Sequence, residues 1–122
     1  MTSSFGSMSV PQLVEQFTQD ALKQFTAELY DEHTKYNRLS RDMVAISEEL
    51  KARSGDQRAA LVVLFAHPNP QVRLMAAEVT LAVAPVAARQ TLQELWDQKE
   101  FPQAAYAMQT LRALERGDRK PT

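Results

Sequence analysis

The sequence predicts an all-α fold of about six helices packed as antiparallel pairs, and three observations support it. Residues that favour helix, above all Ala, Leu, Gln, Glu and Arg, dominate the 122 residues, and only three residues are glycine. Apolar side chains recur at the three- and four-residue spacing of a buried helix face. Pro70, Pro85 and Pro102 stand where helices are expected to start, and the short connections there force neighbouring helices to pack antiparallel.

The first two helices are predicted from one start signal and one stop signal. Ser9 followed three residues later by Gln12 forms a capping-box pattern, so the first helix is expected over residues 10–30. A second apolar stripe over residues 36–50 predicts the next helix. Gly55 is expected to stop that helix because glycine readily adopts the left-handed conformation.

The remaining four helices are predicted in the same way. Asp56 is suited to cap a third helix, whose dense apolar face indicates burial. Asn69 is a good cap for a fourth helix because Pro70 follows at the first helical position. The two later prolines open the fifth and sixth helices, and Gly117 is expected to end the sixth.

An internal repeat appears when the sequence is shifted by 30 to 31 residues. Large apolar residues of the third helix then align with those of the fifth, and small residues of the fourth align with those of the sixth. Each unit is therefore a helix with long side chains followed by an Ala-rich helix. The first set of aligned residues is Leu61, Leu64 and Phe65 with Leu92, Leu95 and Trp96.

Residues 69–77, Asn-Pro-Gln-Val-Arg-Leu-Met-Ala-Ala, resemble the inter-helix turn and second helix of a HEAT repeat. The resemblance is clear over 56–84 and weaker over 85–116. It implies a short right-handed α-α superhelix of the HEAT/armadillo-like kind. The whole chain, with Tyr36-Asn37-Arg38-Leu39 ahead of this half, is also similar to a bacterial family of small helical proteins of unknown function. The residues that match the repeat pattern are Pro70, Val72, Arg73, Ala76, Ala77 and Leu81.

These patterns predict one helical domain with loose ends. About three helix pairs are needed to bury a continuous core, so the N-terminal pair is expected to act as the third unit and as a cap. Homodimerisation through an uncapped end stays an alternative, and Met8 is a second candidate start. The expected parts are a disordered leader (1–8), one domain (9–116) and a C-terminal tail (117–122). Within the domain we expect an N-terminal helix pair (9–54), a clear repeat (56–84) and a degenerate repeat (85–116).

Composition argues against several classes of function. The absence of cysteine excludes disulfides and thiolate chemistry. Neither a signal peptide nor a membrane span is recognisable, so we expect a cytoplasmic protein with no membrane partner. Asp31, Glu32 and His33 form a polar turn rather than a metal site, because no second cluster supplies further ligands. We expect no metal, no cofactor and no catalytic residue, and therefore no enzyme.

The favoured hypothesis is a non-catalytic module that binds an unknown protein or peptide. The contact surface would be the exposed face formed by the second helix of each helix pair. Aromatic and arginine side chains are enriched at binding hot spots. Arg73 has a structural alternative, because the matching arginine of HEAT-like stacks commonly reaches a carbonyl or acid of the neighbouring repeat. An ordinary solvated face is the other alternative. The predicted binding residues are Asn37, Arg38, Arg41, Arg73, Gln103, Tyr106, Gln109 and Arg112.

Two rival functions stay open. A nucleic-acid binder would use the basic C-terminal end, although a formal charge of −1 and the lack of a strongly basic segment argue against it. An enzyme assembled from residues distant in sequence would show a deep pocket with converging polar groups. The basic residues in question are Arg112, Arg116, Arg119 and Lys120.

Overall fold

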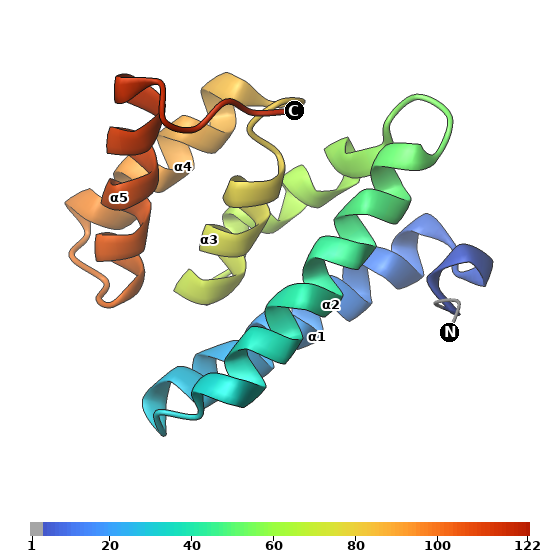
Figure 1. Cartoon of the computed structure of the whole chain (residues 1–122), viewed down its shortest axis with the longest axis horizontal. Helices are drawn as coiled ribbons and strands as arrows, with labels where there is room; N and C mark the ends of the chain where they lie inside the picture. Colours follow the sequence, from blue (N-terminus) through green and yellow to red (C-terminus); the bar gives the residue numbers. More distant parts are fainter. Residues whose placement is uncertain (1–3) are drawn as a thin grey trace. The chain divides into compact units, whose positions relative to one another are not determined.

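The computed structural model describes residues 4–122, and this part of the chain is all-α, as predicted (Figure 1). Six main helices and one short N-terminal 3-10 helix are present over these residues, and no strand is found among them. The chain divides into two compact units, residues 1–60 and residues 61–122. Over the described range, every helix is too short or too polar to cross a bilayer.

The first unit is built on α1 (Val10–Leu29) and α2 (His33–Ala52), which pack against each other. The predicted capping box starts α1: the Gln12 amide donates to Ser9 Oγ (3.2 Å) and the Ser9 amide donates to Gln12 Oε1 (2.8 Å). Both helices direct apolar residues into a shared core. Its fully buried large side chains are Leu13, Phe17, Met43, Ile46 and Leu50.

The N-terminal segment differs from the expected disordered leader. Residues 1–3 lie outside the described residues, but η1 (Ser4–Ser7) is a 3-10 helix. Its order has a physical cause in Arg53, just after α2, whose Nη2 donates to the carbonyl oxygens of Phe5 (3.1 Å) and Met8 (2.6 Å). Sequence periodicity could not reveal this contact because its partners are 45 or more residues apart.

The predicted third helix is present as a 3-10 helix, η2 (Gln57–Ala66), rather than as an α-helix. The burial pattern explains the difference. Arg58, Leu61 and Leu64 are buried at intervals of three residues, which matches the three residues per turn of a 3-10 helix. Asp56 does cap this segment, because its Oδ1 accepts a hydrogen bond from the Arg58 amide (3.3 Å).

The second unit contains α3 (Pro70–Val79), α4 (Pro85–Asp97) and α5 (Gln103–Arg116). The predicted starts are confirmed for α3 and α4, each with proline in its first turn, and Pro102 is the N-cap of α5. Asn69 caps α3. Gly117 ends α5 in the left-handed conformation, with φ of 77°. The buried core shared by these helices is Leu74, Ala77, Leu81, Ala88, Leu92, Leu95, Ala107 and Leu114.

Two side-chain contacts give the direction of α3 relative to α5. Gln103 donates to Gln71, and Thr110 donates to Glu78, and in each pair the residues are 32 positions apart. A constant offset at two points means that both helices run in the same direction. α4 contacts both α3 and α5, and α3 also contacts α5, so the three helices of the second unit all pack against one another.

Candidate functional site

The predicted binding residues fall into two separate sets. Asn37, Arg38 and Arg41 are exposed on α2 of the first unit. The other five lie on α3 and α5 of the second unit. Among those five, Gln109 and Arg112 are exposed, as predicted for a contact surface.

Arg73 is not the exposed residue that the hypothesis required. Its side chain is only 14% exposed, and Nη2 contacts both carboxylate oxygens of Glu100 at 3.0 and 3.1 Å. Nη1 donates to Gln98 Oε1 (3.2 Å). The guanidinium therefore fastens the start of α3 to the loop between α4 and α5, which is the structural role that the sequence left as an alternative.

Gln103 was also expected to be exposed, and this is wrong, because only 1% of the residue is accessible. It lies in the first turn of α5, on the side that faces α3, where its Nε2 donates to Gln71 Oε1 at 2.9 Å. Tyr106 is half-buried against the core of the second unit. The face of the second helices is therefore largely used for internal packing.

The basic C-terminal end is partly neutralised by its own neighbours. Arg119 pairs with the Glu78 carboxylate through Nη1 and donates to the Glu78 carbonyl oxygen through Nη2 (2.9 Å). Arg116 pairs with Asp118 at 2.8 Å. Two of the four basic side chains that would bind a nucleic acid are thus already paired with carboxylates.

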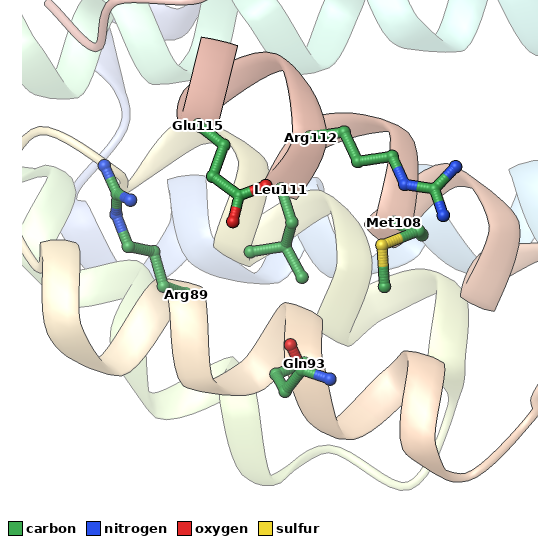
Figure 2. A pocket seen from close by; sticks show the side chains of 6 residues that line it. All are labelled: Arg89, Gln93, Met108, Leu111, Arg112 and Glu115. Carbon is green, nitrogen blue, oxygen red and sulfur yellow. The ribbon is translucent and has the colours of Figure 1, made fainter. Parts of the chain in front are cut away.

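A groove on the second unit runs between α4 and α5, with a volume of about 290 Å³ (Figure 2). Met108 and Leu111 supply an apolar floor. Figure 2 shows Arg89 and Arg112 at opposite ends of this floor, with Leu111 between them. The lining residues are Arg89 and Gln93 from α4, and Met108, Leu111, Arg112 and Glu115 from α5.

The two arginines of the groove differ from the other arginines of the second unit. Arg89 and Arg112 have no ion-pair or hydrogen-bond partner among the described residues, whereas the other three are paired with carboxylates. Both groove arginines are exposed to solvent. Their guanidinium N–H groups are therefore available to a ligand.

The groove also offers hydrogen-bond acceptors. Glu115 is exposed and takes part in none of the ion pairs of the described chain. Gln93 Nε2 donates to Asp97 Oδ1 (3.0 Å), which leaves the Gln93 side-chain carbonyl for other contacts. Two arginines and one glutamate give the lining a formal charge of +1. The combination suits binding of a partly apolar, anionic ligand.

Sequence reasoning found only Arg112 among the groove residues. A signal was present, because Met108, Leu111, Arg112 and Glu115 follow helical spacing on one side of α5. The opposing Arg89 and Gln93 could not be matched to them without the packing of α4 on α5.

Neither histidine is among the residues that line this groove. His33 is the first residue of α2 and is exposed, and His67 Nδ1 accepts a hydrogen bond from the Asn69 amide (3.0 Å). His67 therefore supports the turn before α3. Within residues 4–122, no group of three or more His, Asp or Glu side chains is arranged to hold a metal ion.

Comparison with known proteins gives one family and one solved structure. A family model described as "Domain of unknown function (DUF2019)" matches residues 11–115. The chain is also similar to the protein RPA1889 from the bacterium Rhodopseudomonas palustris CGA009, with 45% sequence identity. The alignment with its crystal structure covers 99% of this chain and 100% of that one, with a TM-score of 0.95. No curated protein matches the chain.

Proposed function

Because the chain belongs to the DUF2019 family, a domain family of unknown function, we propose a function from its surface chemistry: a non-catalytic module that binds a protein or peptide segment in the α4–α5 groove. This moves the proposed contact surface from the second helices to the space between the two helices of the last pair. Arg112 belongs to both surfaces.

The observation that carries the proposal is the union of an apolar floor with unpaired arginines in one groove. Met and Arg are enriched where proteins contact each other. Met108 is half-exposed and flexible, so it can adapt to a partner side chain. The groove is formed by two neighbouring helices, and a groove between helices suits a peptide segment.

We also propose that the second unit is built from HEAT-like pairs. Three features support this: the capped turn at Asn69 and Pro70, the parallel course of α3 and α5, and the contact of Arg73 with Glu100. In such repeats one helix pair stacks on the next, and a groove between helices provides an extended contact surface.

The test is a crosslinking capture with a matched control. A photo-reactive residue at Gln93 is expected to crosslink a partner in lysate of the source organism. The double variant Arg89→Glu/Met108→Glu should abolish that crosslink. The control Arg38→Glu/Val44→Glu makes the same kind of change at an exposed arginine and an exposed apolar residue of α2, and should leave the crosslink intact.

Helical content of each variant is checked first by circular dichroism, so that loss of binding is not loss of folding. Equal crosslinking by the groove variant and by the wild type would contradict the proposal. Crosslinks that form only from a photo-reactive residue at Arg41 would move the binding surface to α2 of the first unit.

A further inference from the structure

We propose that the segment bound in the α4–α5 groove is an acidic peptide, with an apolar residue flanked on both sides by carboxylate side chains. This inference rests on the proposed function and adds the chemistry of the partner. It follows from the charges of the groove, from their positions and from the acceptors that lie beside them.

The unpaired arginines supply the charge complementarity. A planar guanidinium binds a carboxylate through two parallel N–H···O contacts, and such charge-assisted pairs are stronger than neutral ones. The protein uses this contact at Arg58, whose Nε and Nη2 donate to the two carboxylate oxygens of Asp56 at 2.9 and 2.7 Å. Among the described residues, no carboxylate forms an ion pair with Arg89 or Arg112, so both guanidinium groups are available to the carboxylates of a ligand.

The positions of the groove residues set the order of groups in the ligand. Arg89 and Arg112 lie at the two ends, and Leu111 lies between them (Figure 2). Met108 and Leu111 are half-buried, and Leu111 also packs against the core, so the two side chains present apolar surface to the groove. An apolar side chain on this floor, with a carboxylate toward each end, satisfies all three features.

The acceptors favour a peptide over a simple organic anion. The Glu115 carboxylate and the Gln93 side-chain carbonyl both accept hydrogen bonds, and a peptide backbone brings N–H donors. Glu115 also repels surplus negative charge at its end of the groove. Removing this charge while keeping a side-chain carbonyl, as Glu115→Gln does, should therefore strengthen the binding of an acidic peptide.

A nucleic acid fits the groove less well. Single-stranded nucleic acid is normally held by a positive track with aromatic side chains that stack on the bases. No aromatic residue lines the groove, and the nearby Arg116 and Arg119 are engaged by Asp118 and Glu78. The local charge of +1 is small for a phosphate backbone.

The experiment uses the full chain and a fluorescein-labelled probe peptide, Glu-Glu-Gly-Leu-Gly-Glu-Glu, with the matched probe in which every Glu is Gln. Fluorescence anisotropy should show binding of the acidic probe and at least tenfold weaker binding of the neutral one. Arg89→Gln and Arg112→Gln should each lower the affinity for the acidic probe by about tenfold, and added salt should lower this affinity further.

Two further variants sharpen the result. Glu115→Gln should tighten binding of the acidic probe by roughly two- to fivefold, since it removes a like charge at short range. Arg38→Gln/Arg41→Gln removes two exposed arginines of α2 and should change nothing, although it lowers the net charge more than either single groove variant does.

The outcomes separate this inference from the proposed function. If the acidic and neutral probes bind the wild type with equal affinity, and Met108→Glu abolishes binding of both, the acidic chemistry is overturned. The proposal that the groove binds a peptide would then still hold. Absence of binding up to about 1 mM acidic probe would also overturn it, while the Gln93 crosslink decides the groove independently. Tighter binding of a labelled oligothymidylate, lost in Arg89→Gln, would replace the peptide by a nucleic acid.

Discussion

The side-chain amide of Gln103 donates a hydrogen bond of 2.9 Å to Gln71 Oε1, and both residues are almost completely buried. The bond joins the first turn of α5 to the first turn of α3. A buried polar pair of this kind is stabilising only when both partners are present, because each amide loses its water on folding. It therefore specifies the register at which the two parallel helices meet.

Replacing Gln103 by Leu should destabilise the protein by about 1–3 kcal/mol, because it removes the buried hydrogen bond from Gln103 Nε2 to Gln71 Oε1. The measurement is the free energy of unfolding in urea. Gln109→Leu makes the same change at an exposed position of the same helix and should stay within about 0.5 kcal/mol of the wild type. Equal effects of both variants would show that the buried bond contributes nothing specific.

The helices were predictable from sequence because their start and stop signals act locally. The Ser9–Gln12 box, the Asn69 cap and the Gly117 stop each involve residues within a few positions of one another, and all three are present. The 3-10 form of residues 57–66 was not predicted. Its apolar residues are so dense that spacings of three and of four both fit the sequence.

The candidate site was less predictable because it depends on packing between helices. Arginine at a helix surface looks the same in sequence whether its partner is water, an internal acid or a ligand. Only the folded chain shows that Arg73 meets Glu100, 27 residues away, and that Arg119 meets Glu78, 41 residues away. Arg89 and Arg112 are distinguished by the absence of such a partner among the described residues.

The Arg73–Glu100 pair predicts an asymmetry between arginine and lysine. Arg73→Lys keeps the charge but loses the planar fork that reaches Glu100 and Gln98 together, so it should cost about 1–2 kcal/mol of unfolding free energy. Arg116→Lys, at a pair that is about 60% exposed, should cost almost nothing. Thermal and urea unfolding measure both; a loss at Arg116 as large as that at Arg73 would refute the structural role assigned to Arg73.

Asp20 on α1 predicts a dependence of stability on pH. Burial raises the pKa of its carboxyl above the ordinary value of 3.8; the hydrogen bond from Gln16 opposes this rise and the nearby charge of Asp42 adds to it. Its Oδ2 has no hydrogen-bond partner among the described residues. The folded state therefore binds the Asp20 proton more tightly than the unfolded state does. The contribution of the Asp20 carboxyl to the free energy of unfolding is therefore lost as the pH rises from 3.8 through the folded-state pKa.

Asp20→Asn removes the buried charge and should stabilise the protein by about 1 kcal/mol at neutral pH. Below about pH 3.5 the gain should vanish, because Asp20 is then neutral in both states. Urea unfolding of the two proteins across this range measures the difference. Asp31→Asn, at an exposed turn residue, serves as the control and should show no such trend. A gain that is the same at both ends of the range would assign the effect to packing instead of charge.

The last prediction concerns the N-terminal segment, which Arg53 holds through two backbone carbonyls, those of Phe5 and Met8. Arg53→Gln removes both contacts and should speed hydrogen exchange at the Met8 amide, which is bonded to the Phe5 carbonyl, by on the order of tenfold. The capping box at Ser9 lies outside this contact, so α1 should start at the same residue in the variant.

Glu49→Gln supplies the matched control for this prediction. It removes the ion pair between Glu49 and Arg53 Nε (2.9 Å) and leaves both carbonyl contacts of Nη2 in place. Exchange at Met8 should then stay within about twofold of the wild type. Fast exchange in Glu49→Gln and wild-type exchange in Arg53→Gln would reverse the assignment. The order of residues 5–8 would in that case depend on the carboxylate of Glu49 rather than on the guanidinium of Arg53.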